Sequence, residues 1–293
     1  MMSTSKTVVF FGSGPVAAKS LEFIASHFEI EAVVTKPVPA HHKGIAPVET
    51  LASDLNLPLL FASNKSELDA LVKDHPFTSN LGIIIDYGVI VSANVIDSFP
   101  LGIVNSHFSL LPEWRGADPI TFSILSGQPK TGVSLMVIDE GLDTGKLLTE
   151  KSIVISPDET TPSLTDRLIS LSNQLVLEYI PLYQNGELKP KNQPHPDRAT
   201  YSRKLTKADG LLDFEKPADV LEREVRAFIG WPKSRMTFGS HLIIVTKAHV
   251  ETTKKTPLHM LCGDGAYLSI DELIAPSGKT MKAEDFLRGY AAG

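Results

Sequence analysis

Apolar runs typical of buried strands alternate with helical patterns along the first 127 residues, and this alternation constrains the fold more than any other feature. VVFF (8–11) has the continuous apolar character of a strand buried in a parallel sheet. Four later runs are of the same type: EIEAVVTKP (29–37), PLLFA (58–62), LGIIIDYGVIV (81–91), which breaks at Tyr87-Gly88, and GIV (102–104). The pattern predicts an α/β domain with a doubly wound, mostly parallel sheet.

The helices between these strands carry their own start signals. PVETLASDLN (47–56) and KSELDALVKD (65–74) read as helices, with Ser63 or Asn64 as the N-cap of the second. NVIDSFP (94–100) predicts a short helix before the strand GIV. Right-handed crossovers would then place the loops that follow the strands at one edge of the sheet.

The stretch NSHFSLLPEWRGADP (105–119) leaves the sheet at that edge. Strand alternation puts Asn105 and His107 on one face and Ser106 on the other. A carboxamide can donate a hydrogen bond to a developing oxyanion, and a histidine can move a proton near neutral pH. We expect acyl-transfer chemistry here, with Asp143 as the accompanying carboxylate. The alternative is a purely structural role, in which Asn105 caps the end of a strand and His107 is a buried, hydrogen-bonded histidine.

Asp143 lies in the turn-rich loop DEGLDTG (139–145). TGVSLMVID (131–139) and KLLTEKSIVIS (146–156) flank this loop and predict an antiparallel pair. Two helices complete this part of the chain, one from about Asp118 to Leu125 and one over 161–186, with Thr161 as its cap and Pro162 at its first position.

The chain beyond this helix changes character. ELKPKNQPHPDRAT (187–200) has three prolines and no apolar rhythm, so it predicts a linker. After it, short strands separated by Gly and Pro, with one helix near 217–229, predict a small all-β barrel of the OB type. The expected division is a catalytic domain over 1–186, a linker over 187–202 and a β-barrel domain over 203–293.

Composition excludes several classes of protein. The 293 residues are 42% hydrophobic and 21% charged, which is ordinary for a globular chain. No apolar run approaches the length of a membrane span, so no membrane partner is expected and a cytoplasmic protein is the default. The single cysteine, Cys262, excludes an intramolecular disulfide. The net charge of −6 is not that of a dedicated nucleic-acid binder, although the part beyond residue 196 is slightly basic.

Two motifs suggest cofactors that other features argue against. GSGPVA (12–17) matches G-x-G-x-x-A, but the second strand ends in Thr35 and Lys36 where a nicotinamide-binding unit needs an acidic residue, so we expect no NAD. His41-His42 lacks ligand spacing and a third ligand, so we expect no metal.

NSHFSLLPEWRGADPI together with GVSLMVIDEGLDTG resembles the formyltransferases that use 10-formyltetrahydrofolate. That family carries N-x-H-x-SLLP-x-x-RG-x-x-P followed by a late D-x-G-x-D-T-G. YSRKLTKADG (201–210), RAFIGWP (226–232) and SGKTMKAEDFLRGY (277–290) resemble its methionyl-tRNA branch, so the resemblance extends from residue 7 to about 290.

The resemblance implies 10-formyltetrahydrofolate as co-substrate, no metal and no NAD. It implies that a formyl group passes to the amino group of initiator methionyl-tRNA in translation initiation, and we expect a monomer. Asn105, His107 and Asp143 match the family's catalytic residues. The residues implied to line the folate pocket are Ser109, Leu110, Leu111, Pro112, Tyr87 and Gly88.

The sequence departs from the family's pattern at two places. Asp86 stands where relatives usually have a small apolar residue, either as a buried carboxylate at the edge of the pterin pocket or, as we favour, facing solvent or capping the next turn. The loop KPVPAHHKGIAPV (36–48) is shorter than the basic tRNA-contacting loop of the family and holds only Lys36 and Lys43, which weakens that part of the resemblance.

The C-terminal part contributes cations that could contact RNA phosphates. They are Lys204, Lys207, Arg223, Arg226, Lys233 and Arg235. For each lysine alone a solvated surface is the better interpretation, and Trp231 is favoured as an anchor of a turn over a stacking platform. Arg115 and Gly116 are expected to shape the loop after His107.

Three rival functions share these residues. A sugar-nucleotide formyltransferase would differ in its C-terminal module, and a formyltetrahydrofolate hydrolase would use the same residues on water. A non-catalytic RNA-binding protein is the third, against which the intact trio argues.

Overall fold

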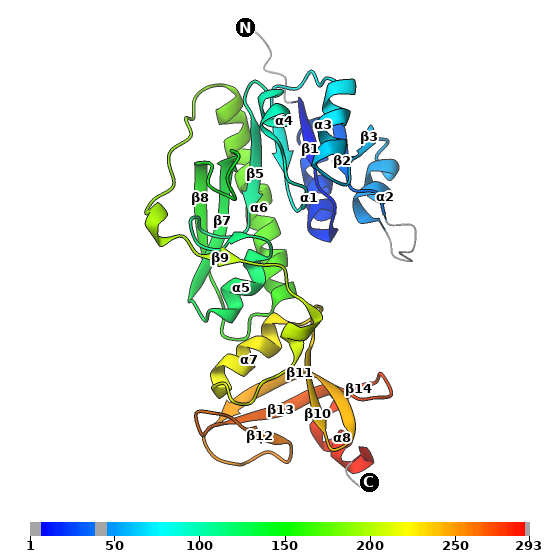
Figure 1. Cartoon of the computed structure of the whole chain (residues 1–293), viewed down its shortest axis with the longest axis vertical. Coiled ribbons are helices and arrows are strands. Elements are labelled where there is room, and N and C mark those ends of the chain that lie inside the picture. The colour runs from blue at the N-terminus through cyan, green and yellow to red at the C-terminus, as the bar shows by residue number, and fades with distance from the viewer. Residues whose placement is uncertain (1–6, 39–45, 291–293) are drawn as a thin grey trace. The chain divides into compact units, whose positions relative to one another are not determined.

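The computed structural model describes residues 7–38 and 46–290 (Figure 1). These residues divide into two compact units. The first takes in Met1–Pro119, Thr131–Ile153 and Thr165–Tyr201, and the second takes in Ile120–Lys130, Val154–Leu164 and Ser202–Gly293. The pair His41-His42 and the cation Lys43 lie outside the described residues.

A seven-stranded sheet with the order β3-β2-β1-β4-β5-β7-β8 organises the first unit. Its strands are β1 (Thr7–Phe11), β2 (Glu29–Thr35), β3 (Leu59–Phe61), β4 (Gly82–Ile84), β5 (Ile103–His107), β7 (Lys130–Val137) and β8 (Lys146–Val154). The five strands from β3 to β5 pair in parallel and β7 is antiparallel to β5. This is the doubly wound, mostly parallel sheet expected from the sequence.

The helices of this part of the chain follow the expected segments closely. They are α1 (Pro15–Ala25), α2 (Pro47–Asp54), α3 (Lys65–Asp74), α4 (Ala93–Asp97), α5 (Pro119–Leu125) and α6 (Thr161–Gln184). Asn64 caps α3, because its side-chain oxygen accepts a hydrogen bond from the backbone N–H of Glu67 at 3.1 Å.

Two expected boundaries were wrong. Thr161 does not cap α6: the helix begins at that residue, and the hydroxyl of the preceding Thr160 accepts from the N–H of Ser163 at 3.3 Å. The strand expected to break at Tyr87-Gly88 ends earlier, at Ile84, because Asp86 takes a left-handed conformation (φ 51°) that no strand tolerates.

The first unit has a core of side chains between the parallel strands and the helices beside them. Phe11 lies at its centre, with Tyr87 at 5.8 Å and Phe99 at 6.0 Å between ring centroids. Offset and edge-on rings at these separations contribute beyond the area they bury. The packing of Tyr87 fixes the chain just beyond β4, next to the candidate site.

The second unit contains an antiparallel half-barrel with the strand order β10-β11-β13-β12 and β14 added to β13. These strands are β10 (Ser234–Phe238), β11 (His241–Glu251), β12 (His259–Leu261), β13 (Tyr267–Ile274) and β14 (Thr280–Lys282). One helix, α7 (Ala218–Ala227), was expected. A second, α8 (Ala283–Tyr290), was not, and its Phe286 is fully buried in the half-barrel core.

Shorter elements complete the described chain. Two 3-10 helices, η1 (Pro196–Arg198) and η2 (Lys207–Gly210), and a two-stranded pair of β6 (Arg115–Gly116) with β9 (Tyr201–Ser202) stand outside the large sheets. Within the part that the structure describes, every helix is too short or too polar to span a bilayer.

Candidate active site

Strand β5 sets the direction of the two side chains that the sequence singled out. Ser106 turns to the opposite face, where its hydroxyl lies 2.7 Å from that of Ser172 in α6. The expected alternation therefore holds, and Asn105 and His107 share the other face. Asn105 is partly accessible, and its carboxamide makes no hydrogen bond with any other described residue.

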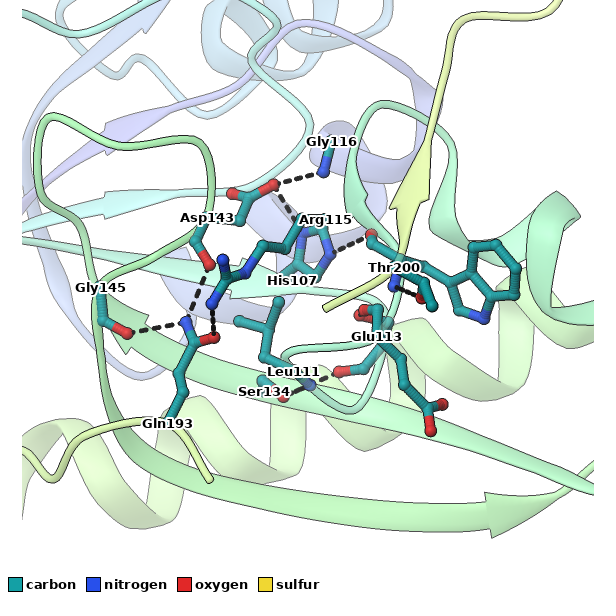
Figure 2. Close-up of polar contacts among 12 residues, drawn as sticks. His107, Leu111, Glu113, Arg115, Gly116, Ser134, Asp143, Gly145, Gln193 and Thr200 are labelled. Carbon is teal, nitrogen blue, oxygen red and sulfur yellow. Dashed lines mark hydrogen bonds and ion pairs between the residues drawn. The ribbon is translucent and has the colours of Figure 1, made fainter. Parts of the chain in front are cut away.

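His107 is buried, and each of its ring nitrogens faces an oxygen atom (Figure 2). Nε2 lies 2.9 Å from the carbonyl oxygen of Trp114, and a carbonyl only accepts, so Nε2 carries a proton. Nδ1 faces the carboxylate of Asp143, with 3.8 Å between Nδ1 and Oδ2. That separation suits an ion pair and is too long for a direct hydrogen bond. In the neutral ring, Nδ1 is therefore left as a proton acceptor that faces a carboxylate.

The loop over 139–145 is built to hold Asp143 in this place. Asp139 organises its start, accepting hydrogen bonds from the N–H of Gly141 at 3.1 Å and the hydroxyl of Thr144 at 2.6 Å. Asp143 itself has a left-handed backbone (φ 51°). A Cβ on Gly145 would lie 2.0 Å from the carbonyl oxygen of Val137, so only glycine fits where the loop returns to the sheet.

The loop after β5 contacts the same carboxylate. The N–H of Gly116 donates to Asp143 Oδ2 at 2.7 Å. Two loops that are separate in sequence therefore meet on one oxygen atom. We refer to Asn105, His107 and Asp143 as the candidate trio.

Residues of the expected linker complete this arrangement (Figure 2). Gln193 is buried, and its amide nitrogen donates to the carbonyl oxygens of Asp143 at 2.8 Å and Gly145 at 2.9 Å. Its amide oxygen accepts from the guanidinium of buried Arg115 at 2.6 Å. Farther along, the Thr200 hydroxyl accepts from the N–H of Trp114 at 2.9 Å. Sequence reasoning missed Gln193, Trp114 and Thr200, because a stretch without periodicity gives no sign of long-range contacts.

The SLLP segment is largely buried. Ser109 is fully buried, and its hydroxyl donates to the carbonyl oxygen of Glu113 at 2.5 Å. Leu111 packs with Met136 and Leu147, and its N–H donates to the Ser134 hydroxyl at 3.0 Å. Pro112 is buried and Leu110 is partly accessible. Backbone atoms and Leu110 are what this segment can offer a ligand.

Beyond β4, the side chain of Tyr87 points into the core and its hydroxyl donates to the carbonyl oxygen of Ala62 at 3.2 Å. Burial raises the pKa of this phenol above its usual value. Gly88 is exposed, with φ at 67°. A Cβ there would lie 3.1 Å from Nζ of Lys36.

Asp86 is an exposed residue, but its carboxylate lies against Gly14 and does not point freely into solvent. Protein atoms crowd this carboxylate, and the partial loss of hydration raises the pKa of Asp86 to about 6. Lys36 opposes the shift and Asp118 adds to it.

Metal-ligating side chains do not gather anywhere in the described ranges 7–38 and 46–290: no three of His, Cys, Asp and Glu are placed to hold an ion. β2 ends at Thr35 and Lys36 follows it, so the end of that strand offers no carboxylate for a ribose.

In the second unit, the six cations singled out from the sequence fall into two groups. Arg223 and Arg226 line a groove of about 560 Å³ beside α7. Each forms an ion pair within that helix: Arg223 with Asp219 at 2.7 Å, and Arg226 with Glu222 at 2.6 Å. Arg235 hydrogen-bonds the carbonyl oxygen of Lys207.

Lys204, Lys207 and Lys233 form the second group, because their side chains are exposed and have no ion-pair partner among the described residues. Trp231 lies near them: its ring nitrogen donates to the carbonyl oxygen of Leu205 at 3.4 Å, while 56% of the residue stays exposed. The hydrogen bond to Leu205 is a contact of the kind expected if Trp231 anchors a turn, and the ring also remains accessible to solvent.

Comparison with known proteins agrees with the resemblance noted in the sequence. The family model described as formyl transferase matches residues 6–180, and the one described as formyl transferase, C-terminal domain, matches residues 204–291. A methionyl-tRNA formyltransferase of Myxococcus xanthus is 36% identical, over 97% of this chain and 95% of that protein. One from Janthinobacterium is 33% identical, over 97% of each.

Solved structures share the fold at lower identity. The sugar 3N-formyl transferase WlaRD superposes with a TM-score of 0.68 at 18% identity, covering 90% of this chain and 97% of that one. The N-formyltransferase of Helicobacter canadensis superposes with a TM-score of 0.65 at 18% identity, covering 90% of this chain and 98% of that one. With both family models matched in chain order and relatives above 30% identity along nearly the whole length, the chain belongs to the formyl transferase family, as an enzyme of that family.

Proposed function

We propose that this enzyme transfers the formyl group of 10-formyltetrahydrofolate to the amino group of methionyl-initiator tRNA for translation initiation. The observation that carries the reaction class is the meeting of His107 and Asp143, 3.8 Å apart, beside a carboxamide that no described residue engages. The acceptor is supported by relatives named methionyl-tRNA formyltransferase that match almost the entire chain.

In the proposed mechanism, the acceptor amine attacks the formyl carbon and the carbonyl oxygen becomes negative. The free carboxamide of Asn105 donates a hydrogen bond to that oxygen. The amine loses one proton, and the departing folate nitrogen gains one. Asp143 and Nδ1 of His107 are the groups that take the proton up and return it, because both face the same space and Nε2 is already committed to Trp114.

For the folate, we propose that the SLLP segment and the turn at Tyr87-Gly88 form the pocket through their backbone. The buried side chains of Ser109, Leu111 and Tyr87 would fix the shape of that backbone, and Leu110 and exposed Gly88 would touch the ligand. The solved relatives support a folate: the Helicobacter canadensis enzyme was crystallised with folinic acid, and WlaRD in the presence of 5-N-formyl-tetrahydrofolate.

For the tRNA, we propose a catalytic domain over 1–186, a linker over 187–202 and a tRNA-contacting domain over 203–293, in a chain that acts as a monomer in the cytoplasm. The exposed, unpaired Lys204, Lys207 and Lys233 are the best phosphate contacts, since Arg223 and Arg226 already pair with carboxylates. Replacing the three lysines with Gln should weaken tRNA binding and reduce its salt dependence by up to about three released counterions. The matched control replaces three other exposed lysines, Lys254, Lys255 and Lys279, with Gln and so removes the same charge.

A single-turnover assay with 10-formyltetrahydrofolate and methionyl-initiator tRNA tests the proposal. Formyl-methionyl-tRNA is the expected product. Free formate alone would make the enzyme a hydrolase, and transfer only to an amino-sugar nucleotide would make it a sugar N-formyltransferase. Asn105→Ala serves as the inactive control that separates enzymatic from spontaneous transfer.

A further inference from the structure

Three parallel strands reach the same edge of the first sheet. Phe11 of β1 is paired with Ile84 of β4, and Ile84 is paired with Asn105 of β5. β1 and β4 end at these positions, and β5 continues for two more residues to His107. The residues that follow the three paired positions therefore lie at one edge of the sheet. They are the glycine turn over 12–14, Asp86, and His107, so Asp86 stands at the same edge as the candidate trio.

The glycine turn leads into α1, whose N-terminus is open. Gly14 is the N-cap residue, Pro15 is the first residue of the helix, and no side chain caps the helix. A glycine turn that opens a helix is a ready-made place for an anion, because backbone N–H groups and the helix dipole both favour negative charge. In many α/β proteins a ligand phosphate occupies such a turn.

Here a carboxylate of the chain itself lies against the turn. A Cβ on Gly14 would come within 2.2 Å of Oδ2 of Asp86, so the carboxylate rests on the Gly14 backbone. The carbonyl oxygen of Asp86 accepts from the N–H of Ser13 at 3.0 Å, which ties the two loops together. The left-handed backbone of Asp86 aims the side chain this way, and aspartate tolerates that conformation better than most residues.

Two other charged groups act on this carboxylate. Lys36 follows β2, with its backbone N–H bound to the Ser13 hydroxyl at 3.1 Å, and Asp118 precedes α5. Among the described residues, one cation and one other carboxylate act on Asp86, and together they supply no excess positive charge that would attract a phosphate. With a pKa of about 6, Asp86 is ionised at neutral pH, so a bound phosphate would meet a negative charge at contact distance.

We propose that Asp86 is a specificity-determining residue that closes the glycine turn to anionic groups, so that the acceptor amine must come from a part of the substrate without negative charge. The aminoacyl ester end of a charged tRNA meets this condition at its amine, whereas an amine presented next to a phosphate would be rejected. This inference rests on the proposed formyl transfer for its meaning, but not for its test.

The test measures sulfate binding by the full-length protein as a thermal shift against chloride at matched ionic strength. Sulfate keeps one charge state between pH 5 and 8, and the thermal shift needs no formylation. At pH 8, Asp86→Asn should bind sulfate at least ten-fold more tightly than the wild type. Asp86→Ala also removes the carboxylate, without introducing an Asn side chain, and should likewise bind sulfate more tightly than the wild type. Asp54→Asn changes the net charge equally at an exposed position and should have no effect.

The pH dependence separates charge from shape. As the pH falls through about 6, Asp86 takes up its proton, and at pH 5 the wild type should bind sulfate as tightly as Asp86→Asn. Equal affinities at pH 8, or a difference that persists unchanged at pH 5, would overturn the proposal. A sulfate effect without formyl transfer to tRNA would retain the role of Asp86 and refute the proposed function, so the two failures are distinguishable.

Discussion

Replacing Gln193 with Met tests whether the expected linker holds the catalytic loop. Methionine has nearly the size and flexibility of glutamine, so the change removes hydrogen bonds and leaves no large cavity. Three contacts are lost: two bonds to the carbonyl oxygens of Asp143 and Gly145, and one from the guanidinium of Arg115.

The size of the effect follows from these contacts. A neutral hydrogen bond contributes about 1 kcal/mol net, and one to a charged donor about 1.5–3 kcal/mol. The three contacts sum to about 3.5–5 kcal/mol, and relaxation of the groups around position 193 recovers part of this, so the free energy of unfolding should fall by about 2–4 kcal/mol. Asp143 loses an anchor of its loop, and because catalysis is sensitive to displacements of about 1 Å, kcat should fall by roughly 10- to 100-fold.

Two assays measure these effects: chemical denaturation for stability, and single-turnover formylation for catalysis. Gln193→Glu keeps an acceptor for Arg115 but turns a carboxylate oxygen toward two carbonyl oxygens, so it should lose turnover as well. Asn192→Ala changes the exposed neighbour and should behave as the wild type. If Gln193→Met had wild-type stability and turnover, the segment would be a linker after all and the argument for loop support would fail.

Three further predictions concern the trio, a helix cap and a surface carboxylate. Alanine at any member of the candidate trio should lower turnover by on the order of 10² or more without unfolding the protein; near-wild-type turnover in His107→Ala would remove that residue from the mechanism. Asn64→Ala should cost about 1 kcal/mol in chemical denaturation through loss of the α3 cap, with KM unchanged; an unchanged unfolding midpoint would count against the cap. Hydrogen bonds from the Arg203 guanidinium, then from a backbone N–H, hold the pKa of Asp209 well below its usual range. A lowered folded-state pKa stabilises above the unfolded value of about 3.9, so the stability gap between wild type and Asp209→Asn should be complete at neutral pH and shrink as the pH falls below about 4; a gap independent of pH would contradict this.

Local sequence patterns determined the secondary structure because they depend on neighbours along the chain. Apolar runs predicted β1 and β5, the adjacent cap candidates Ser63 and Asn64 predicted the start of α3, and strand alternation placed Asn105 and His107 on one face. The errors are local as well. The cap of α6 was placed at Thr161, one residue after the Thr160 hydroxyl that accepts the hydrogen bond, and helix α8 at the C-terminal end was not predicted.

The candidate site was only partly accessible to the same reasoning. The sequence named the trio and placed Asp143 with His107, but it gave neither the 3.8 Å separation nor the contact between Nε2 of His107 and the carbonyl oxygen of Trp114. It also implied pocket residues such as Leu111, whose side chain the structure places in the core.

The sequence by itself determined the α/β class, the order of strands and helices and the chemical identity of the trio, because periodicity and motif are properties of adjacent residues. Only the tertiary structure decided what supports and surrounds the trio. Gln193 lies 50 residues beyond Asp143, and Asp86 lies 72 residues beyond Gly14. Each pair meets because strand register and loop closure bring the two segments together, and no local pattern records such a contact.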